Sequence, residues 1–178
     1  MKKIVLMGNP NVGKSVFFSR LTGANVIASN YPGTTVDFSK GRMCLGKEGH
    51  EIIDAPGTYS LEPSNKAEEV ARDVFDQADL VVNVVDATNL ERNLYLTIQI
   101  LEQKKPVIVA LNMWDEARHT GVSIDISKLE QDLQVPVVPT VALSGEGIYN
   151  LIQRIDEARP AETIDPMSER DRWIKIGE

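Results

Sequence analysis

The chain of 178 residues lacks several features that define particular classes of protein. A single cysteine, Cys44, excludes an intramolecular disulfide framework and a cluster of thiolate metal ligands. No apolar run approaches the roughly 18 residues that a membrane-spanning helix needs. Positive charge is in deficit: 19 Lys and Arg residues stand against 26 Asp and Glu residues, and the net charge is -7. This balance argues against a nucleic-acid partner, and we expect a soluble, cytosolic chain.

What the sequence does contain is a repeated alternation of apolar runs and amphipathic stretches. Four of the runs are continuous and β-branched: Ile4–Leu6, Leu80–Val82, Val107–Val109 and Pro136–Val138. Such runs are typical of strands that helices cover on both faces. Two further strands, Phe38–Leu45 and His50–Asp54, are separated by a short link and predict a hairpin. We therefore predict an α/β domain over residues 1–158, with a six-stranded, mostly parallel sheet, one antiparallel edge strand and helices on both faces.

Two further regions show sequence signals for the start of a helix. Thr88-x-x-Glu91 and Ser127-x-x-Glu130 each match a capping box, in which two side chains satisfy backbone donors at a helix start. Residues 159–178 are interpreted as a linker followed by the beginning of another helix. That helix would start at Ser168 and include Trp173, Ile174 and Ile176. Because it would end almost as soon as it began, we expect the chain to be a fragment of a longer protein.

The strongest motif lies near the N-terminus. Residues Gly8–Ser15 match G-x-x-x-x-G-K-[ST] between a predicted strand and a predicted helix. Backbone N–H groups of such a loop surround phosphate oxygens, and the helix N-terminus adds partial positive charge. Lys14 is expected to reach the β- and γ-phosphates, and the Ser15 hydroxyl to ligate Mg²⁺. The alternative is a glycine-rich turn with an incidental lysine. The residues expected to bind a nucleotide here are Gly8, Asn9, Pro10, Asn11, Val12, Gly13, Lys14, Ser15 and Val16.

Two later segments indicate that the nucleotide is a triphosphate that is hydrolysed. Asp54–Gly57 has the form D-x-x-G and resembles the corresponding motif of GTPases. There Asp54 would hold Mg²⁺ through water, and the Gly57 N–H would detect the γ-phosphate. Gly33, Thr34 and Thr35 precede the hairpin, where a GTPase threonine closes over Mg²⁺ and the γ-phosphate. As alternatives, Asp54 would only cap a turn, and the threonines would be ordinary strand formers.

Two further segments favour guanine as the base. Asn112-Met113-Trp114-Asp115 resembles the guanine-recognising N-K-x-D, with Met113 in place of the usual lysine. A carboxylate placed for the two guanine N–H donors discriminates strongly, because adenine would leave it unpaired. Alternatively, Asn112 and Asp115 are turn residues that end a strand. Val141, Ala142 and Leu143 occupy the place where GTPases supply a backbone N–H to the guanine carbonyl.

The most distinctive stretch, Val84–Thr97, closely resembles the cytosolic G domain of the ferrous iron transport protein B family. Segments 8–11, 30–33, 56–61 and 110–113 also match, so the resemblance covers roughly residues 2–158. It implies a Ras-like P-loop GTPase followed by a helical regulatory domain and a membrane transport domain, which would be its partners. It also implies the cytoplasmic face of the bacterial cell membrane, and it allows a homo-oligomeric full-length protein.

The resemblance also bears on catalysis. Ras-like enzymes place a glutamine after D-x-x-G to orient water, whereas Thr58 stands there in this chain, so we expect slow hydrolysis. Asn11 matches the residue that coordinates K⁺ in potassium-stimulated relatives, and carbonyls near 30–33 would complete the ion's shell. Alternatively, Asn11 is a loop asparagine in an unusual conformation. The family pattern Thr-Val-acid selects Thr35 over its neighbour for Mg²⁺. The expected catalytic residues are Lys14, Asn11, Thr35 and Gly57.

Together these motifs predict a Mg²⁺-dependent GTPase of low intrinsic rate, stimulated by K⁺. It would signal its nucleotide state through switch I (residues 25–37) and switch II (residues 56–69). Two alternatives remain: a nucleotide-sensing module with incidental hydrolysis, and a ribosome- or tRNA-associated GTPase, against which the acidic charge argues. Cys44, His50 and His119 show no ligand spacing, so we expect no iron site in this chain.

Overall fold

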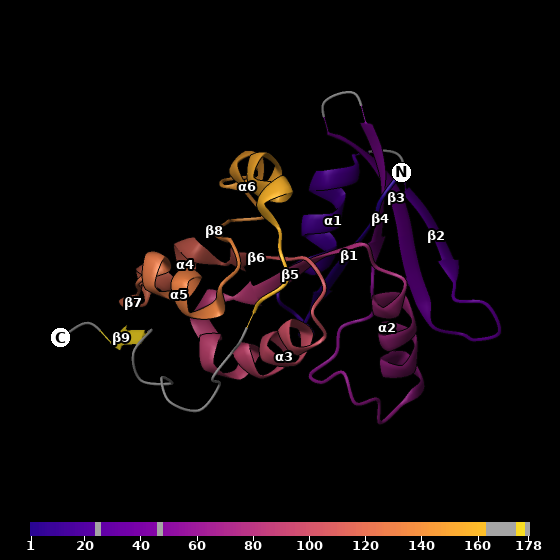
Figure 1. The fold of residues 1–178 in the computed structure, drawn as a ribbon, viewed down its shortest axis with the longest axis horizontal. Helices are drawn as coiled ribbons and strands as arrows, with labels where there is room; N and C mark the ends of the chain where they lie inside the picture. The colour runs from indigo at the N-terminus through magenta and orange to yellow at the C-terminus, as the bar shows by residue number, and fades with distance from the viewer. Residues whose placement is uncertain (24–25, 46–47, 163–173, 177–178) are drawn as a thin grey trace.

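A seven-stranded sheet forms the centre of the protein, for which a computed structural model describes residues 1–23, 26–45, 48–162 and 174–176 (Figure 1). The strand order is β2-β3-β4-β1-β5-β6-β8. The bounds in that order are Val26–Asn30, Asp37–Leu45, Glu48–Asp54, Lys3–Gly8, Leu80–Asp86, Val107–Asn112 and Val137–Pro139. From β4 to β8 every neighbouring pair is parallel, which confirms the predicted α/β class.

The β2–β3 end of the sheet differs from the prediction. β3 pairs antiparallel with β4, as the predicted hairpin requires, but it also pairs antiparallel with β2. The edge strand is therefore β2, and the sheet has seven strands instead of six. All five residues of β2 are exposed, so this segment lacks the alternating apolar pattern that marks a half-buried strand. Only its pairing with β3 makes it a strand.

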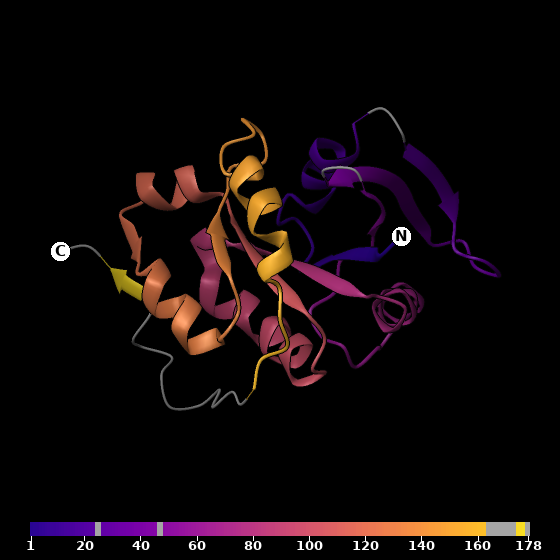
Figure 2. The same cartoon turned by 45° about the horizontal axis from the view of Figure 1, so that its top comes forward.

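Helices cover both faces of the sheet (Figure 2). On one face Phe75 and Leu96 pack with Val5 of β1, and on the other Phe17 and Leu151 pack with the next residue, Leu6. Neighbouring residues of β1 thus enter opposite cores, as the pleat of a strand requires. Within the described ranges, every helix falls short of the length and apolar character that crossing a bilayer needs. The helices are α1 (Lys14–Thr22), α2 (Lys66–Asp76), α3 (Leu90–Glu102), α4 (Trp114–His119), α5 (Ile126–Leu133) and α6 (Ile148–Arg154), with 3-10 turns η1 (Ala87–Asn89) and η2 (Ile155–Glu157).

Both predicted capping boxes are wrong. Thr88 lies in η1, before α3 begins, where Asp86 Oδ1 accepts bonds from its backbone N–H at 2.8 Å and its hydroxyl at 2.6 Å. Ser127 lies inside α5, and the N-cap is Asp125, which accepts a bond from the third residue of that helix at 2.9 Å. In both places an upstream aspartate takes the capping position, because a carboxylate is as good an acceptor there as a hydroxyl.

The predicted linker and following helix are only partly described. Residues 159–162 pack on the domain: the Val107 N–H donates to the Arg159 carbonyl at 3.1 Å, and Ala161 is buried. Strand β9 (Ile174–Ile176) pairs antiparallel with β7 (Val122–Ile124). The helix predicted to include residues 174 and 176 is therefore wrong there, because the β7 edge supplies a pairing partner that no local pattern announces. Ser168 and Trp173 lie outside the described residues, and the assignment of this stretch to a following domain stays a prediction.

Candidate phosphate-binding site

The start of α1 differs from the starts of α2 and α5. Its N-cap, Gly13, makes no side-chain hydrogen bond, and the first turn contains no acidic residue. By contrast, Asn65 caps α2 and Asp125 caps α5. The first N–H groups of a helix have no partner within the helix, and the helix dipole favours negative charge beside them. The start of α1 is therefore left open to an anion from outside the chain.

Asn112, at the end of β6, holds the loop before α1 in place. Its Nδ2 donates to the Val12 carbonyl at 2.8 Å, and its Oδ1 accepts from the Ala142 N–H at 2.9 Å. Gly13 lies so close that a Cβ atom there would be 2.5 Å from Asn112 Nδ2, and its φ of 84° is one that glycine adopts without strain. One buried side-chain amide thus joins the predicted phosphate loop (residues 8–15) to the base loop, the predicted base-binding segment of residues 141–143.

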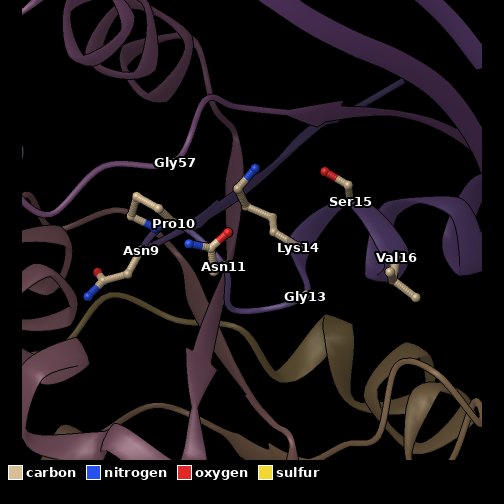
Figure 3. Close-up of a pocket in the computed structure, with 8 residues that line it drawn as sticks. All are labelled: Asn9, Pro10, Asn11, Gly13, Lys14, Ser15, Val16 and Gly57. Atoms are coloured by element: carbon tan, nitrogen blue, oxygen red, sulfur yellow. The ribbon is translucent and has the colours of Figure 1, made fainter.

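A pocket of about 320 Å³ opens at this loop (Figure 3). Within it the Lys14 ammonium contacts Asp54 Oδ1 and the Ala55 carbonyl, and the Ser15 hydroxyl donates to Asp54 Oδ2 at 3.0 Å. Three of the residues predicted for phosphate and Mg²⁺, Lys14, Ser15 and Asp54, are therefore in direct contact. The residues that line the pocket are Asn9, Pro10, Asn11, Gly13, Lys14, Ser15, Val16 and Gly57.

The two asparagines of the loop point in different directions (Figure 3). The Asn11 side chain lies beside Lys14, and its φ of 65° is left-handed, as the alternative interpretation of this residue also expects. The Asn9 side chain points away from both, and its Oδ1 is buried with no hydrogen-bond partner among the described residues. Asn9 therefore lines the pocket without its side chain approaching Lys14.

The D-x-x-G segment lies against the phosphate loop. A Cβ atom on Gly57 would be 3.0 Å from Pro10 Cα, so a side chain there would require the phosphate loop to shift by a few tenths of an ångström. The next residue, Thr58, donates its backbone N–H to the Gly8 carbonyl at 3.1 Å. Its buried hydroxyl donates to the Ser60 carbonyl at 2.7 Å. The side chain at the position of the usual glutamine therefore has a structural partner and does not line the pocket.

The structure does not bring the switch I threonines to this site. Gly33, Thr34 and Thr35 do not line the pocket, and their turn lies at the outer edge of the molecule beyond β2 and β3 (Figures 1 and 2). The Thr34 hydroxyl donates to the Tyr31 carbonyl at 2.9 Å and accepts from the Val36 N–H at 3.1 Å. Thr35 is exposed. Of the two threonines, Thr35 thus has the hydroxyl that is not used within the turn.

The predicted base-binding residues cluster at the ends of β6 and β8. Met113, between buried Asn112 and helix α4, has a left-handed φ of 59°. This bend places Asp115 in the first turn of α4, where its carboxylate is exposed. The Val141–Leu143 segment follows β8 and is tied to Asn112 through Ala142. These residues are therefore brought together at the same edge of the sheet as the phosphate loop.

Several residues that shape the site carried no sequence signal. Gln99 of α3 accepts bonds from the Ser60 hydroxyl at 3.1 Å and the Leu61 N–H at 2.8 Å, and so fastens switch II to α3. Arg20 of α1 binds the backbone of the base loop. At the end of the distinctive 84–97 stretch, the buried Thr97 hydroxyl accepts a bond from Asn83 at 2.7 Å, so this part of the stretch serves the core.

Nothing in the described residues resembles a transition-metal site, because no three His, Cys, Asp or Glu side chains converge there. Cys44 is exposed on β3, whereas His50 is buried on β4. The oxygen ligands at Ser15 and Asp54 are hard donors, which suit Mg²⁺. The chemistry that the site can perform is therefore binding of a Mg²⁺-complexed phosphate.

Comparison with known proteins identifies the family. A sequence model of the family described as ferrous iron transport protein B matches residues 2–155. The Fe(2+) transporter FeoB of Helicobacter pylori (strain J99) is 45% identical over 163 residues, which cover 88% of this chain and 25% of that protein. The chain spans only between 18% and 25% of the length of the first curated relatives it matches.

Two solved structures agree closely with the fold. The cytosolic domain of L. pneumophila FeoB has a TM-score of 0.87 at 42% identity, covering 92% of this chain and 73% of that one. The cytosolic domain of the T. maritima FeoB iron transporter in its GMPPNP form has a TM-score of 0.85 at 43% identity, covering 92% and 66%. The chain therefore belongs to the ferrous iron transport protein B family, and it has the P-loop GTPase fold of that family's cytosolic G domains.

Proposed function

We propose that this G domain binds GTP with Mg²⁺, hydrolyses it slowly, and acts as the nucleotide-controlled switch of a ferrous iron membrane transporter. The observation that carries the proposal is the meeting of Lys14, Ser15, Asp54 and Gly57 at the uncapped start of α1. Residues of these types position and neutralise a transferring phosphoryl group. The GMPPNP form of the T. maritima relative supports a guanine nucleotide as the ligand.

Magnesium fits the donor set of this site. Mg²⁺ is usually held by one or two protein oxygens together with phosphate oxygens and water. The Ser15 hydroxyl and the Asp54 carboxylate, 3.0 Å apart, supply such oxygens. Bound there, the ion would neutralise charge on the phosphates. Lys14, whose ammonium contacts Asp54 in this structure, would turn to the β- and γ-phosphates.

Slow hydrolysis is supported by the environment of Thr58. Its hydroxyl donates to the Ser60 carbonyl, so it offers no base to the pocket. Turnover would therefore rest on positioning and on charge stabilisation by Lys14 and the Gly57 N–H. The same observation favours a second candidate, a nucleotide-sensing module in which binding acts and hydrolysis is incidental. A measurement of GTP turnover would distinguish the hydrolysing switch from the nucleotide-sensing module.

We extend the proposal to stimulation by K⁺. Asn11 lines the pocket beside Lys14, and its side-chain oxygen is a suitable ligand for a monovalent cation. The positive charge there would take the part of an arginine finger. Residues 30–33, which are expected to complete the ion's shell, do not line the pocket. Completion of the shell therefore requires the switch I turn to move toward the phosphate loop.

The proposed switch acts on parts of a longer protein. When GTP is hydrolysed, the γ-phosphate would no longer contact Thr35 and Gly57, and switch I and switch II would then change their contacts. The proposed partners are a helical regulatory domain and a membrane transport domain, with the G domain on the cytoplasmic face of the bacterial cell membrane. A homo-oligomeric transporter is compatible with this arrangement. The net charge of -7 speaks against the alternative of a ribosome- or tRNA-associated enzyme.

Phosphate release tests the proposal directly. It is measured with GTP and with ATP, in KCl and in NaCl at equal ionic strength, for the wild type, Asn11→Ala and the exposed control Asn150→Ala. We expect turnover with GTP only, stimulation by K⁺, and loss of that stimulation in Asn11→Ala alone. Equal rates in the two salts would refute the K⁺ site. Equal use of ATP would refute guanine recognition.

A further inference from the structure

Within the described residues, the loop after β8 leaves the backbone N–H groups of Leu143 and Ser144 unused. The Val141 N–H donates to the Glu146 carbonyl and the Ala142 N–H to Asn112 Oδ1, both at 2.9 Å. The Leu143 and Ser144 N–H groups have no acceptor within the described ranges of the chain. Of the two, the Leu143 N–H lies next to Ala142, which is tied to the predicted base-binding residue Asn112, so it is the one placed to serve the guanine carbonyl. The Leu143 side chain is 77% exposed, so its packing does not fix the direction of that N–H.

Arg20 holds the peptide unit to which this N–H belongs. From the last turn of α1, its Nε donates to the Ala142 carbonyl at 3.0 Å, and its Nη2 contacts the Leu143 carbonyl. In a trans peptide the C=O and the following N–H point in opposite directions. Because Arg20 holds the Ala142 carbonyl toward α1, the Leu143 N–H is turned away from α1.

We infer that Arg20 is a positioning residue for guanine recognition, which it serves by fixing the direction of the Leu143 N–H. The inference rests on the proposed binding of guanine nucleotides. It also connects the two ends of the site, because α1 begins at Lys14 of the phosphate loop and ends beside the base loop. A planar guanidinium binds two carbonyls with a rigid set of donors, which the flexible ammonium of lysine does not reproduce.

A purely structural role for Arg20 predicts a different result. A cation in the last turn of a helix stabilises the helix dipole, and lysine serves that purpose as well as arginine. If this were the whole role of Arg20, Arg20→Lys would behave as the wild type. A role in positioning instead requires that the effect of Arg20 depend on the guanine O6 atom, the acceptor of the Leu143 N–H.

The test compares dissociation of GDP with that of 6-thio-GDP, in which a weakly accepting sulfur replaces O6. We expect Arg20→Ala to accelerate GDP dissociation about tenfold, as for loss of a charge-assisted hydrogen-bond anchor, and 6-thio-GDP dissociation about twofold. Arg20→Lys is expected to follow Arg20→Ala. The exposed control Arg42→Ala, on β3, is expected to match the wild type for both nucleotides.

Three results would contradict the inference. Equal acceleration of both nucleotides by Arg20→Ala would show a structural effect that is independent of O6. Unchanged GDP dissociation in both Arg20→Ala and Arg20→Lys would show that the loop needs no anchor on α1. Wild-type protein that bound ATP as tightly as GTP would overturn the proposed function itself, and the inference with it. Failure of the inference alone leaves wild-type guanine selectivity intact.

Discussion

The phosphate pocket and the switch I turn are held in opposite ways. The pocket joins separate elements: Asp54 of β4 binds Lys14 and Ser15 of α1, and Thr58 binds the Gly8 carbonyl of β1. The hydrogen bonds of the turn stay largely within residues 31–36, where the Tyr31 N–H donates to Val36 at 2.8 Å and the Thr34 N–H donates back to Tyr31 at 3.0 Å. The Tyr31 hydroxyl also accepts a bond at 3.3 Å from Gln77, the residue that follows α2.

This difference separates binding from sensing. The pocket residues already meet, so phosphate can bind with little rearrangement beyond a turn of the Lys14 side chain. For Thr35 to contact the γ-phosphate as proposed, its turn has to move toward the pocket, which Thr35 does not line. A ligand can shift such an equilibrium only by the contacts that it makes in one state and not in the other. The γ-phosphate supplies contacts that GDP lacks, so we expect it alone to close switch I.

The strongest way to break the pocket is Lys14→Ala. Loss of a charge-assisted contact with phosphate is expected to weaken GTP binding about 100-fold, which corresponds to about 2.7 kcal/mol. The measurement is the Kd for GTP, with Lys2→Ala as the control because that lysine is exposed and lies outside the predicted site. A Kd within about threefold of the wild type would show that the pocket does not bind phosphate through this ammonium.

A pair of glycine substitutions isolates the packing of the phosphate loop. Gly13 and Gly23 both have positive φ, 84° and 62°, but only a Cβ on Gly13 would meet a neighbour within 4 Å. Gly13→Ala is expected to displace Asn112 and to weaken GTP binding by about 2 kcal/mol, roughly 30-fold. Gly23→Ala should cost about 1 kcal/mol of unfolding free energy and leave the Kd unchanged. Equal effects on the Kd would place the cause in φ strain alone.

Switch I is tested by Thr35→Ala. Loss of its hydroxyl is expected to slow GTP hydrolysis about tenfold, because the hydroxyl acts only in the closed state, and to change GDP affinity less than about twofold. Thr34→Ala is the matched control, since its hydroxyl is used within the turn. Stopped-flow phosphate release and GDP titration measure the two quantities. A larger loss of hydrolysis in Thr34→Ala would reverse the assignment.

The smallest effect concerns the contrast between capped and uncapped helix starts. Asn65→Ala removes the side chain that accepts the Glu68 N–H at 3.0 Å at the start of α2. It is expected to lower the free energy of unfolding by about 1 kcal/mol, with no change in the Kd for GTP. Urea denaturation provides the first quantity. If the Kd rose in proportion to the loss of stability, binding at α1 would depend on the stability of α2.

The parts of the molecule that follow local patterns could be predicted from the sequence. Continuous apolar runs marked the buried parallel strands, and the glycine and lysine spacing marked the phosphate loop. Strand β2 escaped prediction because all of its side chains are exposed, so only its partner defines it. The N-caps Asp86 and Asp125 were missed because hydroxyl residues downstream of them offered an equally good pattern.

The long-range contacts of the site were beyond the reach of sequence patterns. Arg20 and Ala142 are 122 positions apart, and nothing near either residue indicates their bond. The position of the switch I turn was also unpredictable, because the motif around Thr35 predicts contacts with Mg²⁺ and the γ-phosphate and gives no position for the turn. Motifs therefore predicted the residues of the site, whereas the structure shows which of them are in contact.

Hydrogen exchange of the backbone amides tests the separation of binding from sensing most directly. Exchange is compared in the free protein, with GDP and Mg²⁺, and with GMPPNP and Mg²⁺. We predict that residues 9–16 are protected by both nucleotides, whereas residues 31–36 gain protection only with GMPPNP. Equal protection of residues 31–36 by GDP and GMPPNP would contradict this account. So would the absence of any protection of residues 31–36 with GMPPNP.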